Sequence, residues 1–424
     1  MKRVCMKTAM LVVAWCCTMG AWAYDFEANG IYYGITSTAD KTVEVVVGDA
    51  QYSGDVTIPA TVAYDGITYR VTSIGKHAFY DCSNLASIVI SEGVTSIGDY
   101  AFFNCSSLAS IVIPKGLTSI GNSAFHDCSS LASITLPESL TSIESETFSF
   151  CSSLTSIVIP EGVTSIGEHA FRDCSSLASI TLPESLTSIG KNAFFYCRAL
   201  ASIVIPDGVT TIEFYTFGSC SGLTSITIPE GVTEVGDGAF DGCSSLASIT
   251  IPEGVTSIGY YVFSDCSSLV SITLPESLSS IGWRAFYCCS SLQAIHSRAI
   301  TPPTCGASCF YNVDETSCTL YVPKGTLEAY KAADEWKDFV NIVEEEYTGI
   351  GEVGADSAGQ AVITACGDGI VVENLPAGTA VTVYTLSGTV MYEGVASGSR
   401  TELTLPAGHL YLVKCGPTVT KVAL

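Results

Sequence analysis

Basic residues are scarce in this chain of 424 residues, in which 18 Lys and Arg stand against 42 Asp and Glu and give a formal net charge of −24. A nucleic-acid-binding protein needs a basic face, so we expect no nucleic-acid partner. Charged residues make up only 14% of the chain and apolar residues 47%, a balance that excludes an intrinsically disordered chain. No stretch after the N-terminus reaches the roughly 18 to 20 apolar residues of a membrane-spanning helix, so we expect no transmembrane segment.

Histidine is also rare, and its five residues are dispersed along the chain. His77 and His169 occupy equivalent places in a repeat described below but lie four copies apart, about 19 Å at strand spacing, which is too far for one metal ion. The chain contains no His-Glu-x-x-His, no phosphate-binding loop and no Gly-x-Ser-x-Gly. We therefore predict a non-enzymatic protein with no catalytic residue, no metal site and no cofactor.

The N-terminal residues 1–23 have the pattern of a secretory signal peptide. Three basic residues precede a short apolar run near Ala9–Cys17, and Ala21-Trp22-Ala23 forms a small-x-small cleavage site. This pattern predicts a secreted protein.

Cysteine is abundant, with 19 residues, and its spacing reveals a repeat. Ten Cys recur every 23 residues without an insertion, and each has Phe three residues before it, Leu three residues after it and Ile six residues after it. Ten copies in strict register predict a solenoid in which each coil buries its apolar side chains against its neighbours. We call these residues the ladder cysteines; they are Cys82, Cys105, Cys128, Cys151, Cys174, Cys197, Cys220, Cys243, Cys266 and Cys289.

Each copy contains a short strand that ends near a Pro. The segment Ile111-Val112-Ile113-Pro114 shows the period of two that is typical of a strand with one buried face. If strands of neighbouring coils pair in parallel, ten coils form a rod of about 48 Å. Around Ala170-Phe171 and the equivalent residues of the other copies we expect a compact helical or 3₁₀ segment.

These repeats resemble the BspA-like branch of leucine-rich repeat proteins, whose copies read Leu-x-x-Ile-x-Ile-Pro-x-x-Val-x-x-Ile-Gly-x-x-Ala-Phe-x-x-Cys. The resemblance covers residues 71–297 directly. It implies a solenoid with a parallel β-sheet and short helical or 3₁₀ segments. It also implies a cell-surface protein that adheres to host extracellular-matrix proteins or to other microbes by binding proteins.

Both ends of the repeat region are expected to be capped. Residues 24–70 contain short β patterns separated by Gly-Asp and Asp-Gly turns, which predict a β-rich N-terminal cap. Residues 298–346 resemble the family's C-terminal capping segment, because Leu320-x-Val322-Pro323 repeats the Ile-x-Ile-Pro pattern of the coils. The amphipathic stretch Leu327–Val340 is expected to form a helical lid on this degenerate eleventh coil.

A different domain follows the cap. Residues 347–360 are rich in Gly, Ala and Ser and form a predicted linker. Residues 361–424 show alternating strands and turns that predict a small all-β sandwich. The tracts Leu405-Pro406-Ala407-Gly408 and Leu410–Lys414, with Val381–Tyr384 and Ser387-Gly388 before them, resemble the C-terminal sorting domain of type IX secretion. This resemblance implies display on the outer surface of a Gram-negative bacterium.

The ladder cysteines are interpreted as a structural column. Thiols stacked about 5 Å apart in a line do not form the tetrahedral shell that zinc needs, and each can pack as a small apolar group that donates to a turn carbonyl. Cysteines outside the ladder are disulfide candidates in a secreted protein. We expect the pairs Cys309–Cys318 and Cys366–Cys415, with unpaired thiols as the alternative.

Positions that vary between copies are the candidates for ligand binding, because invariant positions are explained by stacking. The most variable positions lie six, five, two and one residues before each ladder Cys, and they hold many aromatic side chains, which are favoured at recognition surfaces. The alternative is that some of these rings pack between coils. The aromatic residues are Tyr80, Tyr100, Phe103, Phe150, Phe195, Tyr196, Phe214, Tyr215, Tyr260, Tyr261, Trp283 and Tyr287.

Two further surfaces follow from the repeat. Acidic residues one position after the Pro site form a stripe that keeps the rod soluble or attracts cations, with Lys115 as the exception. The outward strand positions hold Ser, Ala, Thr and Val, a flat and uncharged face. We favour adhesion to an extracellular protein of a host matrix or a microbial surface; glycan capture on the same rings and a purely structural spacer remain alternatives.

Overall fold

The computed structural model describes residues 24–345 and, beyond them, the strands between residues 362 and 423 with short breaks. The chain divides into two compact units between Glu345 and Glu346. The predicted signal peptide 1–23 and the predicted linker 347–360 lie outside the described residues, so both stay predictions. Within the described part of the chain, no helix is long and apolar enough to cross a membrane.

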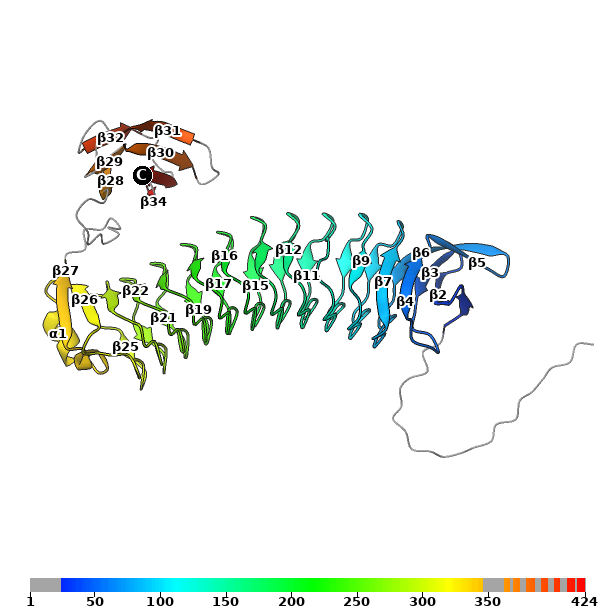
Figure 1. Ribbon diagram of the computed structural model, residues 1–424, viewed down its shortest axis with the longest axis horizontal. Helices are drawn as coiled ribbons and strands as arrows, with labels where there is room; N and C mark the ends of the chain where they lie inside the picture. The colour runs from blue at the N-terminus through cyan, green and yellow to red at the C-terminus, as the bar shows by residue number, and fades with distance from the viewer. Residues whose placement is uncertain are drawn as a thin grey trace, which may run out of the picture. The chain divides into compact units, whose positions relative to one another are not determined.

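The first unit is a solenoid whose coils lie side by side along one axis (Figure 1). Most coils contribute one strand to each of two rows. The first row consists of β4 (Gly54–Ile58), β7 (Leu85–Ile90), β9 (Ser110–Val112), β12 (Ser156–Val158), β14 (Ser179–Thr181), β16 (Ser202–Val204), β18 (Ser225–Thr227), β20 (Ser248–Thr250), β22 (Ser271–Leu274), β24 (Ala294–Ser297), β26 (Thr319–Pro323) and β27 (Asn341–Glu345). The second row consists of β6 (Ile67–Ile74), β8 (Ser96–Ile97), β10 (Ser119–Ile120), β11 (Ser142–Ile143), β13 (Ser165–Ile166), β15 (Ser188–Ile189), β17 (Thr211–Ile212), β19 (Glu234–Val235), β21 (Ser257–Ile258), β23 (Ser280–Ile281) and β25 (Thr304–Cys305).

Where strands of neighbouring coils pair, they pair in parallel, and in the regular copies residues 23 positions apart lie opposite each other. Ser156 pairs with Ser179 and Ile157 with Ile180 in the first row. The middle residue of β12, Ile157, is buried, and its two neighbours are exposed. The prediction of a solenoid with a parallel β-sheet is therefore confirmed.

The segment before each ladder Cys is a run of turns, so the helical or 3₁₀ segment that we expected in the coils is wrong. Successive backbone amides alternate between two partners: Phe102 donates to the carbonyl of Ala124 in the next coil at 2.8 Å, and Phe103 donates to Tyr100 in its own turn at 3.2 Å. A helix would keep all of these bonds within one segment. The alternation requires a left-handed backbone five residues and one residue before each Cys, as at Tyr100 (φ 56°) and Asn104 (φ 57°).

A column of phenylalanine rings forms the core of the solenoid. The Phe three residues before each ladder Cys is fully buried and stacks on the equivalent ring of the next coil, from Phe79 to Phe310, with centroids 4.9 to 5.7 Å apart. Tyr52 covers the first ring at 4.5 Å, and Trp336 covers the last at 5.1 Å. Both ends of the column are thus sealed by aromatic side chains of the caps.

Glycine allows the coils to approach each other along the second row. A Cβ atom on Gly167 would lie 2.5 Å from the backbone nitrogen of Ser145, and one on Gly190 would lie 2.7 Å from that of Glu168. Two coils carry Glu144 and Glu213 at this position instead. The second row is interrupted at these two coils, between β10 and β11 and between β15 and β17. The larger Glu side chain therefore interrupts the second row of strands at the two coils where it replaces glycine.

The N-terminal cap is rich in strands, and it adds β1 (Phe26–Ala28), β2 (Ile31–Ser37), β3 (Thr42–Val45) and β5 (Thr61–Tyr64) to the start of the second row. The C-terminal cap contains α1 (Leu327–Ala332) and the 3₁₀ helix η1 (Trp336–Asp338). The predicted helical lid is therefore shorter than Leu327–Val340, because Glu335 adopts a left-handed backbone (φ 67°) between the two helices.

The second unit is all-β. One antiparallel sheet contains β28 (Val362–Cys366), β29 (Gly369–Glu373) and β32 (Arg400–Thr404). The other contains β30 (Ala380–Thr385), β31 (Val390–Val395), β33 (Leu410–Cys415) and β34 (Thr418–Ala423). Buried residues come from both sheets, among them Val372 and Leu403 from the first and Val383 and Val413 from the second.

The close approach at glycine leads to a stability prediction. We expect Gly167→Ala to lower the free energy of unfolding by about 1 to 3 kcal/mol, because the added methyl group forces two coils apart. Gly116→Ala is the matched control, since a Cβ atom there meets nothing within 4 Å. Urea unfolding followed by circular dichroism measures both variants. Equal stability of the two would show that the coils do not need glycine for their packing.

Candidate functional site

The variable positions before each ladder Cys lie on the outside of the coils. The Ala and Phe positions four and three residues before the Cys are buried, for example Ala101 and Phe102, whereas the flanking residues Tyr100 and Phe103 are half-buried. The alternating turn bonds described above impose this division between inside and outside. We call the outward side chains at these flanking positions the aromatic strip.

All twelve aromatic residues predicted for the strip have solvent-accessible side chains. Phe150 is 38% exposed, Phe214 43%, Tyr260 56% and Trp283 38%. The remaining eight are half-buried: Tyr80, Tyr100, Phe103, Phe195, Tyr196, Tyr215, Tyr261 and Tyr287. None of them is sealed in the interior.

At the N-terminal end of the strip, rings of successive coils stack on one another. Tyr80 stacks on Phe103 with centroids 5.0 Å apart, and Phe103 stacks on His126 at 4.5 Å. His126 reaches Phe150 at 5.2 Å. Burial lowers the pKa of the His126 imidazole. The neutral ring therefore continues the aromatic series at neutral pH.

Arg172 joins this series to the middle of the strip. Its guanidinium carbon lies 5.5 Å from the ring centroid of Phe150 and 5.7 Å from that of Phe195, and its Nε donates to Asp173 at 3.2 Å. Phe195 contacts Tyr215 edge to face at 5.6 Å. The contacts from Tyr80 to Tyr215 thus form one continuous surface.

Glycine interrupts the strip after Tyr215. The Tyr215 ring lies over Gly238, where an added Cβ would come within 2.5 Å of it, and the other outward positions of that coil hold Asp237, Asp241 and Gly242. The strip resumes at Tyr261, which contacts Trp283 edge to face with centroids 4.9 Å apart. This last section is richest in exposed aromatic area.

Sequence reasoning missed several members of the strip because it searched for Phe, Tyr and Trp in the ten regular copies. His126, Arg172 and Arg284 contact the predicted rings directly. Tyr311, in the degenerate eleventh coil, stacks on Tyr287 at 5.1 Å. The signal was present in the chain, since all four residues occupy the same variable positions as the predicted rings.

The ladder cysteines are buried thiols that join each coil to the one before it. From Cys105 to Cys289, each Sγ donates to the carbonyl oxygen of the column Phe in the preceding coil at 3.0 to 3.2 Å. Cys82 has no preceding coil, and its Sγ accepts from the amide of Tyr52 in the N-terminal cap at 3.3 Å. Burial raises the pKa of Cys151 and that of Cys220 to about 12. Within the described residues, no group of three side chains is arranged to hold a metal ion.

Among the cysteines outside the ladder, one predicted pairing is wrong. Cys309 and Cys318 are separate buried thiols. The side chains of Cys366 and Cys415 lie outside the described residues, so that pairing stays a prediction. Cys288 and Cys305 are half-buried free thiols.

Two other surfaces of the solenoid offer fewer features for recognition. The acidic stripe is exposed at Glu92, Glu138, Glu161, Glu184, Asp207, Glu230, Glu253 and Glu276. Glu253 forms an ion pair with Arg298, whose Nη1 lies 2.9 Å from its Oε1. The flat sheet face exposes Val158 (66%) and Val204 (77%) between serine and threonine side chains.

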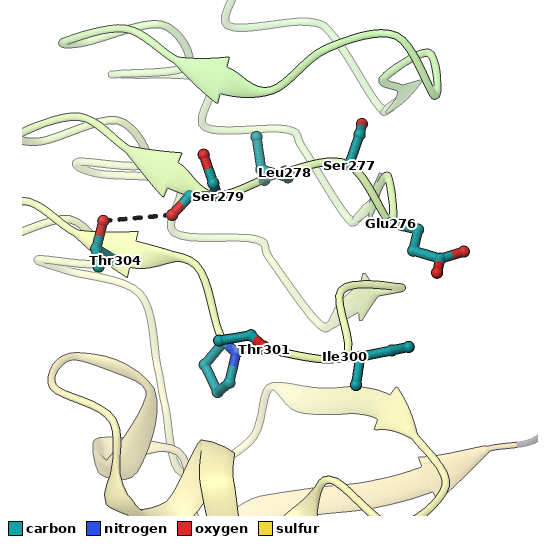
Figure 2. A pocket seen from close by; sticks show the side chains of 8 residues that line it. Glu276, Ser277, Leu278, Ser279, Ile300, Thr301 and Thr304 are labelled. Atoms are coloured by element: carbon teal, nitrogen blue, oxygen red, sulfur yellow. Dashed lines mark hydrogen bonds between the residues drawn. The ribbon is translucent and has the colours of Figure 1, made fainter.

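A shallow pocket of about 350 Å³ lies where the tenth coil meets the C-terminal cap. Figure 2 shows the hydrogen bond of Thr304 with Ser279 on one side of it and the side chains of Glu276 and Ile300 on the other. Apart from Glu276, the lining consists of Ser, Thr, Leu, Ile and Pro. The lining thus contains no pair of acidic and basic groups suited to proton transfer.

Stacked coils of strand and turn around an apolar column define a leucine-rich repeat protein. Residues 72–201 and 187–317 match the BspA type leucine-rich repeat region. Together these residues make up more than half of the chain, so the chain belongs to this family. Proteins of this family are generally binding proteins and not enzymes.

Several solved structures are similar to the chain. A leucine-rich repeat protein from Bacteroides ovatus ATCC 8483 is 28% identical, covers 76% of this chain and 100% of its own, and has a TM-score of 0.49. A leucine rich cell surface protein from Faecalibacterium prausnitzii A2-165 is 28% identical, covers 76% and 95% of the two chains, and has a TM-score of 0.43. The leucine-rich repeat protein of T. pallidum is 31% identical, covers 52% and 90%, and has a TM-score of 0.38. No curated protein matches the chain significantly.

The buried thiols predict a loss of stability in alkali. Below pH 9 a ladder thiol is protonated in the folded and the unfolded chain, and it then has no effect on the pH dependence. Above pH 9 it ionises only in the unfolded chain until the folded pKa is reached, so each thiol should lower the free energy of unfolding by about 1.4 kcal/mol per pH unit.

Urea unfolding between pH 8 and 10 measures this slope. The variant Cys151→Ala with Cys220→Ala should show a shallower slope than the natural chain, even if it is less stable at pH 8. An identical slope would mean that these two thiols ionise equally in the folded and unfolded chains.

Proposed function

We propose that this chain is a surface-displayed adhesion protein that uses the aromatic strip to bind an extracellular protein of a host matrix or of another microbe. The observation that carries the proposal is the strip itself, in which accessible rings and guanidinium groups contact one another from coil to coil. Tyr, Trp and Arg are the residues that dominate binding energy at protein interfaces. They lie here on a rigid frame, so little conformational entropy is lost when a ligand binds.

The location of the protein is part of this proposal. The signal pattern of residues 1–23 supports export, and the resemblance of residues 361–424 to a type IX sorting domain supports display outside the outer membrane of a Gram-negative bacterium. An extended rod between these two ends presents many coils to an external ligand. The binding of proteins by leucine-rich repeats agrees with this location.

The strip is favoured over the two other surfaces on physical grounds. The acidic stripe carries one kind of charge and is open to water, so its single ion pairs contribute about 0 to 1 kcal/mol. The flat sheet face exposes small side chains that vary little between coils, and it therefore offers little specificity. Side chains of the strip differ in every coil, as a specific surface requires.

Glycan capture is the second candidate function, and the accessibility of Tyr260 favours it. Its side chain is 56% exposed, the largest value among the predicted residues of the strip. Aromatic rings that are open on one face can stack against the apolar face of a sugar. A glycan array tested beside immobilised matrix proteins separates the two candidate functions. Absence of binding in both assays would favour a structural spacer.

Replacement of three rings tests the proposed site. We expect Tyr260→Ser, Tyr261→Ser and Trp283→Ser, combined in the full chain, to weaken binding to immobilised matrix proteins about tenfold or more. Serine is already accommodated at the equivalent positions of other coils, as Ser145 and Ser123, so the fold should be kept. Surface plasmon resonance measures the affinity, and thermal unfolding verifies the fold.

The matched control lies on the sheet face. Val158→Ser with Val204→Ser also removes exposed apolar groups, yet it should leave binding unchanged. If the control loses affinity and the triple variant does not, the binding surface is the sheet face and the strip has been assigned wrongly.

A further inference from the structure

The last section of the aromatic strip surrounds an arginine that has no acidic partner. The guanidinium carbon of Arg284 lies 4.4 Å from the ring centroid of Trp283 and 4.8 Å from that of Tyr287. Its Nε atom is buried and makes no hydrogen bond. Among the described residues, no carboxylate lies within ion-pair distance of it.

Arg172 in the middle of the strip shows what Arg284 lacks. Both side chains lie over two aromatic rings, but Arg172 is paired with Asp173, the residue directly before a ladder Cys. In the tenth coil that position is Cys288. The nearby Asp265 carboxylate accepts a hydrogen bond from Ser264. A positive charge without a partner is thus built into a chain that has a net charge of −24.

We infer that the cluster around Arg284 binds a carboxylate, and that this carboxylate belongs to an acidic segment of the protein ligand. The inference rests on the proposed function and names the chemistry of its partner. A planar guanidinium can donate two parallel hydrogen bonds to one carboxylate, and such charge-assisted bonds are among the strongest in proteins. Arg284 is half-buried beside these rings, and its partial removal from water strengthens the pairing.

The arrangement of the rings favours a peptide over a sugar as the source of the carboxylate. Arg284 covers one face of Trp283, and Tyr311 stacks on Tyr287 with an interplanar angle of 8°. Tyr261 meets Trp283 edge to face, at 70°. Flat faces that a pyranose ring would need are therefore partly covered by the chain's own side chains, whereas the guanidinium edge remains available for an Asp or Glu side chain.

Fluorescence quenching tests the local charge without a ligand. In the full chain with Trp15→Phe and Trp22→Phe, emission comes from Trp283, which is 38% exposed, and from Trp336, which is fully buried. We expect iodide to quench Trp283 more strongly than caesium, although the net charge of the chain favours caesium. Arg284→Asn should reverse this order; asparagine already occupies the equivalent position in another coil, as Asn192, with φ 54°. Stronger quenching by caesium in the chain that retains Arg284 would overturn the inference.

Soluble polymers then test the class of ligand, again in the full chain that carries Trp15→Phe and Trp22→Phe. Poly-L-glutamate should protect Trp283 from acrylamide quenching, and Arg284→Asn should weaken this protection about tenfold in apparent affinity. Arg284→Lys should retain part of it, because the charge remains but the planar fork is lost. Lys115→Asn, which removes an exposed cation outside the strip, is the control and should have no effect. Protection by polygalacturonate alone would overturn the assignment to a peptide, and no protection by either polymer would overturn the carboxylate site.

The two proposals can fail separately. If Arg284→Asn leaves binding to matrix proteins intact while the triple ring variant abolishes it, the strip is the adhesive surface but Arg284 does not pair with the ligand. If poly-L-glutamate binds at Arg284 and no matrix protein or cell surface binds the chain, the carboxylate site stands and the adhesion proposal is wrong.

Discussion

Stacking of one coil on the next is the interaction on which the whole solenoid depends. A single coil of 23 residues cannot bury its Phe, Leu and Ile side chains, so its free energy is favourable only in contact with two neighbours. The ring of each coil fills the space above the ring before it, and each thiol from Cys105 onward donates to the carbonyl of that same preceding coil. Apolar packing and hydrogen bonding thus enforce one register, and a shift of a coil would break both.

The same constraint creates the candidate binding surface. Residues that stack vary little, and the turn bonds place them next to residues that point outward. Variation is therefore greatest at the four positions that flank Ala-Phe in each coil. A surface with side chains of many kinds can be built there without a cost in core packing, since the backbone is held by bonds to the next coil. The left-handed residues in this segment are fixed by the same bonds.

The spacing of Cys, Phe, Leu and Ile was sufficient to predict the solenoid and its parallel register, because each of these residues performs one task in every coil. It was not sufficient for the turns around Ala-Phe: short apolar spacing fits a 3₁₀ segment equally well, and the deciding bonds go to another coil. Arg284 could not be assigned from sequence, since its role depends on Trp283 and Tyr287 around it and on Cys288 in place of Asp. The spacing could not show that Cys309 and Cys318 are separate thiols in the folded cap.

Replacement of glycine by Glu144 and Glu213 has a mechanical consequence. At both coils the row of short strands is interrupted, but the turn bonds continue, from Phe125 to Thr147 and from Phe194 to Thr216, each at 2.9 Å. The two interruptions lie three coils apart, so the short-strand side has fewer backbone bonds between coils at these two places than elsewhere in the row. On the turn side the bonds between coils are unbroken at both places, so the backbone keeps the outward rings at the same spacing there as in the other coils.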